Sequence, residues 1–408
     1  MAGSLTTEVV PDAAALRQER RARALAQMEA DGIDILILGR EGNARYVAGA
    51  PRLWTAGSRP FTPGCVLVRS TGDVDLLTTW DEGIPDDIPH EHLYGITFNP
   101  MNMVEVLKGV AGAASAVRVG TDALTPMFAQ LLPMAFPAAE IVDGESAMRR
   151  ARRIKTPAEV AEIRDSVALA ARCLDAATAE LHAGSAERTI TERKITAAFM
   201  EEMARCGVTT PSGQDVAWVT SPDDPWRRGD RDAPLGDGDL VALVGGVVRG
   251  GYTGELGHTV ALGGGHVDLL DRMRELRSAL FAACRPGAPA SDLIEVYSSA
   301  GVTPPPVPIA RGLGLGFDLP IVAADLSATA AADRLDPGVV VALTSYVFQP
   351  GAGAAIAVDP VHITADGPEL LSAPNLFAND TANANDTANA NDAANDNAND
   401  NDADSTNG

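Results

Sequence analysis

Residues 238–263 read GDLVALVGGVVRGGYTGELGHTVALG, and residues 335–372 read LDPGVVVALTSYVFQPGAGAAIAVDPVHITADGPELLS. Both stretches are rich in Val, Ala and Gly, and side chains that could bind a cation are scarce in them. The pattern of apolar residues and glycines indicates the fold, and the scarcity of cation-binding side chains limits the chemistry that the chain can perform.

The formal net charge of the 408 residues is −23, which argues against nucleic acid as a partner because phosphate binding requires a basic surface. Part of this charge lies in residues 379–408, where Asn, Asp and Ala repeat without any Lys or Arg. Such a segment cannot bury enough apolar surface to offset the entropy of ordering it. We therefore predict a disordered tail over residues 376–408.

The absence of membrane-spanning, signal-peptide and paired-cysteine patterns indicates the cellular compartment of the protein. No apolar run is long enough to span a bilayer, and the N-terminus has no apolar signal-peptide core, so no membrane partner is expected. The Cys residues are widely separated and form no CxxC pair: Cys65, Cys173, Cys206 and Cys284. This pattern favours reduced, mostly buried thiols in a cytoplasmic protein.

The N-terminal part alternates helical and strand patterns. Residues 14–31 predict a charged amphipathic helix that ends at Gly32, and residues 33–39 (IDILILG) predict a buried strand. Residues 64–70 and 73–79 read as a hairpin. A helix near 102–112 and a strand near 116–120 complete an α/β domain over residues 1–148.

A domain boundary is marked by RRARRIKTPAEVAEIR (149–164). Thr156 can cap a helix, Pro157 suits the first helical position, and Glu159 completes a capping box. We predict a helix from here to about Ala183, which opens a second domain over residues 149–375.

Several motifs together resemble the pita-bread family of methionine aminopeptidase, prolidase, aminopeptidase P and creatinase. They are GDLV (238–241), GY (251–252), ARGLGLG (310–316), PGVVVALT (337–344) and AAIAVDP (354–360), with IKTPAEVAEIR at the domain entry. The resemblance covers roughly residues 14–372. It implies an α/β (α+β) fold: an N-terminal creatinase-like domain and a pita-bread domain whose curved antiparallel sheet is covered by helices.

The family's metal ligands are mostly replaced. The resemblance puts its two Asp ligands at Val244 and Glu255, and its His ligand at Arg311. Its two Glu ligands fall on Thr344 and Val358; Asp359 is adjacent, but strand alternation points it to the other face. Valine has no donor atom, and arginine stays protonated and only donates hydrogen bonds. We therefore expect no metal and no other cofactor, with the Arg311 guanidinium in place of the ion.

The metal-free precedent in the family, creatinase, does not match either. Its His region reads SPDDPWRRGDR (221–231) here, and its two Glu positions fall on Gly257 and Thr344. The charged and aromatic residues that remain define a candidate cavity. We predict catalytic roles for Glu255, Asp318 and Tyr346, and substrate binding by Arg311, Arg227, Arg228, Trp226, Tyr252 and Thr344.

Three functions are open. The first is a metal-independent hydrolase-like enzyme for a small anionic nitrogen-containing metabolite, acting by C–N hydrolysis, elimination or cyclisation. Arg311, or Arg227 and Arg228, would hold the substrate carboxylate; Glu255 would act as base or nucleophile, with Asp318 or Tyr346 as proton donor. The second is a pita-bread pseudoenzyme that binds a ligand or protein, and the third an Xaa-Pro metallopeptidase. The resemblance also implies a homodimer.

Overall fold

The computed structural model describes residues 12–50, 64–78, 81–95, 97, 99–123, 125–183, 189–316, 318–326 and 333–372. The expected tail over 376–408 lies outside these ranges. The predicted boundary at residue 148 falls inside a helix, α5, and remains a prediction. No helix in the described part of the chain is long and apolar enough to cross a membrane.

The N-terminal part is built on a six-stranded sheet with the order β4-β3-β2-β1-β5-β6. Its strands are β1 (Ile35–Leu38), β2 (Cys65–Val68), β3 (Val74–Leu77), β4 (Leu93–Tyr94), β5 (Arg118–Thr121) and β6 (Glu140–Asp143). Its helices are α1 (Ala13–Asp31), α2 (Glu41–Ala48), α3 (Pro100–Gly109), α4 (Pro126–Ala135) and α5 (Glu145–Arg153). The predicted helix over 14–31 and the hairpin of β2 and β3 are confirmed.

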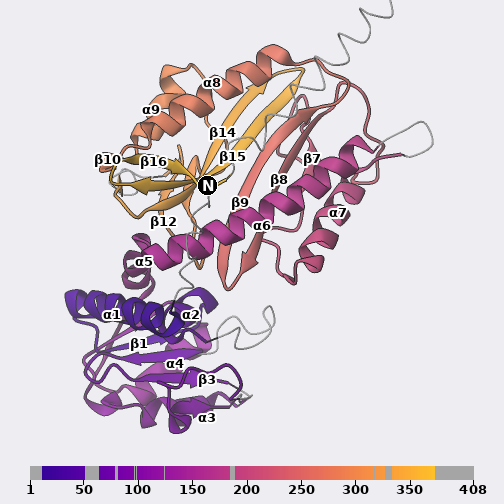
Figure 1. Cartoon of the computed structure of the whole chain (residues 1–408). Coiled ribbons are helices and arrows are strands. Elements are labelled where there is room, and N and C mark those ends of the chain that lie inside the picture. The colour runs from indigo at the N-terminus through magenta and orange to yellow at the C-terminus, as the bar shows by residue number, and fades with distance from the viewer. Residues whose placement is uncertain are drawn as a thin grey trace, which may run out of the picture.

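The C-terminal part is built on an eight-stranded sheet, in which seven strands have the order β12-β11-β14-β15-β9-β8-β7 and the eighth, β16, pairs with β15 (Figure 1). Its strands are β7 (Ala217–Val219), β8 (Leu240–Arg249), β9 (Tyr252–Ala261), β11 (Ala310–Gly312), β12 (Asp318–Val322), β14 (Val340–Gln349), β15 (Gly353–Thr364) and β16 (Gly367–Leu370). β10 (Ala288–Pro289) and β13 (Arg334–Leu335) form a separate small pair.

Four helices cover one face of this sheet: α6 (Pro157–His182), α7 (Glu192–Arg205), α8 (Val267–Ala283) and α9 (Asp292–Ser299). Leu243 packs in the core with α6 and α7, and Leu343 packs with α8 and α9. The strand register places both leucines on the same face, opposite Val244 and Thr344. The predicted pita-bread architecture, an antiparallel sheet with helices packed on it, is therefore confirmed.

Helix α6 begins where its sequence predicts. Thr156 Oγ1 accepts from the Glu159 amide at 3.1 Å, and Glu159 Oε2 accepts from the Thr156 amide at 3.0 Å, which completes the capping box. A Cβ atom at Gly254 in β9 would lie 2.2 Å from the Ser166 backbone of α6. Glycine at this position therefore allows the helix to approach the sheet closely.

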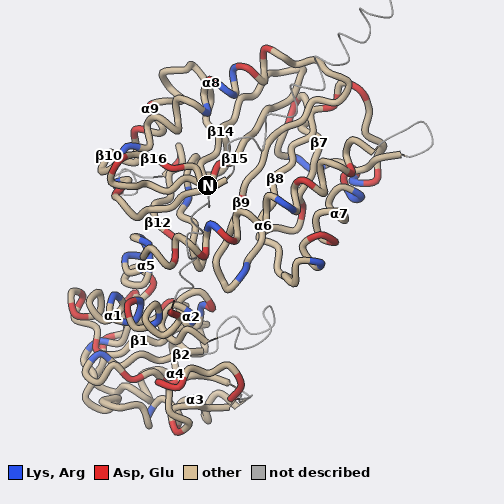
Figure 2. The backbone as a smooth tube through the Cα atoms, viewed as in Figure 1, with Lys and Arg blue, Asp and Glu red and all other residues tan. Residues whose placement is uncertain are grey.

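Buried charged groups join the two parts. Asp318 accepts from Arg152 Nε at 2.9 Å and from Lys155 Nζ at 2.8 Å, and its side chain is 1% exposed. Tyr252 accepts from Arg20 at 2.9 Å and donates to Glu159 at 3.1 Å. Figure 2 shows acidic and basic positions gathered around α1, α2 and α5, whereas the central strands β8, β9, β14 and β15 carry few charges.

Replacement of Asp318 by Ala is expected to lower the free energy of unfolding by about 3–5 kcal/mol, because it leaves two buried cations without their carboxylate. Replacement of Asp336, whose pair with Arg153 is partly exposed, is the matched control, with an expected loss of about 0–1 kcal/mol. Urea unfolding monitored by circular dichroism measures both values. Equal losses in the two variants would show that the Asp318 pairs do not stabilise the junction.

Candidate functional site

Strand register brings the five expected metal-ligand positions onto one face of the sheet. Val244 lies opposite Gly257, Gly246 opposite Glu255, and Thr344 opposite Val358. Val358 in turn pairs with Gly257, and Arg311 pairs with Ala342, two positions before Thr344. Directly paired residues share a face, as do residues two positions apart along a strand. Val244, Glu255, Arg311, Thr344 and Val358 therefore define a single surface, which we call the inner face.

An ion pair occupies the polar part of the inner face. The Arg311 guanidinium donates through Nη2 to Glu255 Oε2, and Ser212 Oγ donates to the same oxygen at 3.3 Å. The side chains of Arg311 and Glu255 are 29% and 15% exposed, so solvent reaches the pair. A solvent-accessible guanidinium can donate two parallel hydrogen bonds to a ligand carboxylate.

Ser212 is absent from the residues expected from sequence. Its backbone amide donates to the Gly246 carbonyl at 2.8 Å, which brings the segment before β7 against β8. A Cβ atom at Gly246 would lie 2.5 Å from Ser212 Oγ, so the glycine leaves room for the hydroxyl. No local sequence pattern identifies this contact, because Ser212 and Glu255 are 43 residues apart.

The residues present do not fit the two-metal centre that the fold family implies. Val244 and Val358 offer no donor atom, and Arg311 offers only hydrogen-bond donors. Glu255 is the one carboxylate among the five positions, and one of its oxygens is engaged by Arg311 and Ser212. Within the described ranges, no group of three or more His, Cys, Asp or Glu side chains could hold a metal ion. We therefore derive no chemical step through a metal.

The adjoining part of the inner face is filled by an aromatic cluster. Trp226 lies 5.5 Å from Tyr346 and 6.3 Å from Trp218 between ring centroids, and Val244 packs against the same cluster. Trp218 Nε1 donates to the Pro225 carbonyl at 3.2 Å, which holds the Trp226 segment in place. Burial raises the pKa of the Tyr346 hydroxyl, so this group remains protonated at neutral pH.

The structure does not bring Asp318 or Tyr252 to the inner face. Asp318 pairs in β12 with Gly312, whose neighbour Arg311 points the opposite way, and it is buried against Arg152 and Lys155. Tyr252 is three positions from Glu255 in β9, so the two side chains lie on opposite faces. The expectation that both residues lie in the candidate cavity is wrong: both contribute to the junction between the N-terminal and C-terminal parts of the chain.

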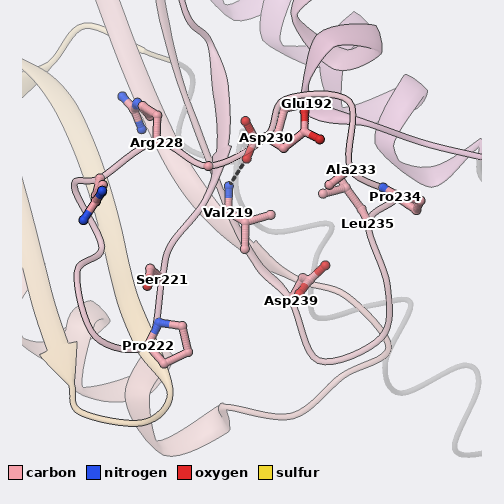
Figure 3. A pocket seen from close by; sticks show the side chains of 12 residues that line it. Glu192, Val219, Ser221, Pro222, Arg228, Asp230, Ala233, Pro234, Leu235 and Asp239 are labelled. Atoms are coloured by element: carbon pink, nitrogen blue, oxygen red, sulfur yellow. Dashed lines mark hydrogen bonds between the residues drawn. The ribbon is translucent and has the colours of Figure 1, made fainter.

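Arg227 and Arg228 line a pocket between β7 and α7 whose lining includes neither Glu255 nor Arg311 (Figure 3). The Arg228 guanidinium lies 3.6 Å above the centre of the Trp218 ring. Asp359 points away from the inner face, as predicted, and accepts from Arg277 of α8 at 2.6 and 2.7 Å.

Glu255, Arg311, Thr344, Tyr346 and Trp226 are therefore the predicted residues that the structure groups together. The first four project from one face of the sheet, and Trp226 covers part of it. Their roles remain predictions. The arrangement supplies a fixed cation, a carboxylate and an apolar surface beside them, which is a site suited to a small zwitterionic ligand.

Comparison with solved structures shows that most of this chain shares the fold of prolidases and dipeptidases. The prolidase from Pyrococcus horikoshii OT3 is 18% identical and has a TM-score of 0.70, covering 87% of this chain and 98% of its own. The Xaa-Pro dipeptidase from Bacillus anthracis is 18% identical and has a TM-score of 0.69, with 88% and 98% covered. The dipeptidase PepE from Mycobacterium ulcerans is 21% identical and has a TM-score of 0.67, with 89% and 97% covered.

No curated protein matches the chain. Two family models do match, and together they span most of the described residues. The creatinase/prolidase N-terminal domain matches residues 20–154, and metallopeptidase family M24 matches residues 161–365. On this evidence the chain belongs to metallopeptidase family M24, in the branch that carries a creatinase/prolidase N-terminal domain.

Proposed function

We propose that this chain acts on short peptides of the Xaa-Pro or dipeptide class, bound at the inner face. The observation that carries the proposal is the solvent-accessible Arg311–Glu255 pair, set on the sheet that matches the family of peptidases. The similar structures include an Xaa-Pro dipeptidase and a dipeptidase, which supports short peptides as the substrate class. A free dipeptide carries a carboxylate and an ammonium group, and the pair offers a partner for each.

The expectation of a metal-independent hydrolase for a small anionic nitrogen-containing metabolite is wrong. The chain matches a family of metallopeptidases, and the solved structures that resemble it include prolidases, dipeptidases and aminopeptidases. We therefore propose peptides, in place of metabolites, as the substrate class. The residues at the five ligand positions nevertheless differ from the metal ligands of this family.

Within the proposal, Arg311 binds the peptide carboxylate and Glu255 holds the ammonium group. Ser212 orients Glu255 by a hydrogen bond to Oε2. Thr344 and Tyr346 project from the same face, and the Tyr346 hydroxyl can donate a hydrogen bond to a carbonyl of the bound peptide. Trp226 supplies an apolar surface beside these groups.

A second candidate function is peptide binding without cleavage. It is favoured by the replacement of four ligand positions, since Val244, Arg311, Thr344 and Val358 supply no carboxylate or imidazole. Peptide recognition is common to both candidates. Release of free proline from the peptide distinguishes them.

We also propose a homodimer in the cytoplasm. Exposed apolar side chains on the N-terminal helices support an interface: Met101 on α3, and Met127 and Met134 on α4. Burial raises the pKa of the Cys173 and Cys284 thiols to about 12, as suits unreactive thiols in a reducing compartment.

Sedimentation velocity is expected to show a dimer, and the double variant Met127→Asp with Met134→Asp is expected to disrupt it because both exposed apolar side chains become charged. A monomeric wild-type chain would contradict the proposed dimer.

Titration with Ala-Pro is expected to give saturable binding that Arg311→Ala weakens about tenfold or more, because a charge-assisted contact to the carboxylate is lost. Ala-Pro amide, which lacks the carboxylate, should bind the wild-type chain as weakly as the free peptide binds the variant. Arg205→Ala, which changes an exposed ion pair on α7, is the control. Calorimetry measures affinity, and proline release measures cleavage; equal affinity for peptide and amide would refute the role of Arg311.

Titration with Mn²⁺, Co²⁺ or Zn²⁺ is expected to reveal no stoichiometric site that depends on Glu255, because the other four positions supply no carboxylate or imidazole. Metal content after dialysis, measured by elemental analysis on the wild-type chain and on Glu255→Gln, checks this. Asp366→Asn, at an exposed turn, is the matched control. A bound ion that Glu255→Gln alone removes would show that the inner face still holds a metal.

A further inference from the structure

A pocket whose lining includes neither Arg311 nor Glu255 is a further candidate site. It has a volume of about 440 Å³ and lies between the first turn of α7 and the segment that joins β7 to β8. In Figure 3, Arg228 lies on one side of this pocket, and Glu192 and Ala233 lie on the other. Its volume is in the range of small-molecule sites, which are about 300–1,000 Å³.

Two guanidinium groups line the pocket, from Arg227 and Arg228. Within the part of the chain that the structure describes, neither forms an ion pair with a carboxylate, although the chain is strongly acidic. Arg228 is an exposed residue whose guanidinium stacks on the Trp218 ring at 3.6 Å, and this contact limits the movement of the guanidinium. A guanidinium held by stacking on an aromatic ring is suited to a planar carboxylate.

Carboxylates also line the pocket, and each retains an oxygen for a further contact. Glu192 Oε1 accepts from the Val219 amide at 2.7 Å, and Asp239 Oδ2 accepts from the Gly236 amide at 2.8 Å. Asp230 Oδ1 accepts from the Asp232 amide at 3.0 Å. Because a carboxylate has about four acceptor sites, these contacts leave room for an ammonium donor. Burial raises the pKa of the Glu192 carboxyl, and a cation beside it would oppose that shift.

The charges therefore define the ligand. A dianion such as phosphate would bind the guanidinium groups but meet three carboxylates in the same pocket. A simple amine would meet the two guanidinium groups. A molecule with one carboxylate and one ammonium group satisfies both sides. We infer that this pocket is a second ligand site, which binds a free amino acid with its carboxylate on Arg228 and Arg227 and its ammonium group on Glu192.

The test is calorimetric titration of the full chain with free L-amino acids, beginning with L-alanine. We expect saturable binding of the amino acid that best fits the pocket. Its amide lacks the carboxylate and its N-acetyl form lacks the ammonium group, so each should bind at least tenfold more weakly. Arg228→Ala and Glu192→Gln should each weaken binding about tenfold or more. Glu192→Gln keeps the oxygen that accepts from Val219, so it is expected to fold.

The controls separate this site from the inner face. Arg227→Ala changes an exposed side chain and should weaken amino-acid binding without a change in thermal stability. Arg205→Ala should leave amino-acid binding unchanged. Absence of saturable binding across the amino-acid panel, tighter binding of inorganic phosphate, or loss of binding in Arg311→Ala would each overturn the inference. The peptide titration depends on Arg311, so failure of one proposal leaves the other intact.

Discussion

The inner face depends on the antiparallel register of β8 with β9 and of β14 with β15. Paired residues share a face, so a slip of one residue would turn every side chain of a strand to the other side. The single bridge between Val358 and Gly257 then joins the two hairpins into one sheet. Gly257 is required there, because a Cβ atom would lie 2.6 Å from the Val244 backbone. This register places Arg311 beside Glu255, and the helices on the opposite face.

The ion pair explains how this face remains stable with so few ligand atoms. A partly buried carboxylate with no partner is costly, and in a metallopeptidase the ions offset that cost. Here a guanidinium supplies the positive charge from within the chain, and valines fill two further positions. The result is a face with a polar part that solvent reaches and an apolar part closed by Trp226 and Tyr346.

The other charged residues near these motifs serve different purposes. Asp318 and Tyr252 are joined to Arg152, Lys155 and Arg20, and these contacts hold the N-terminal part against the C-terminal sheet. Arg227 and Arg228 line a separate pocket beside α7. A charged residue close to a motif along the chain therefore need not contribute to the same site.

The sequence alone determined the local elements, and its resemblance to the pita-bread family located the five ligand positions. Apolar periodicity and the capping residues Thr156 and Glu159 predicted the helices, and glycine and Pro-Gly landmarks anchored the resemblance. Only the tertiary structure decided the partners of Asp318, Tyr252, Arg228 and Ser212. Strand alternation specifies the face on which a side chain lies, but not the element that covers that face. Arg152 and Asp318 are 166 residues apart, and no local pattern encodes their contact.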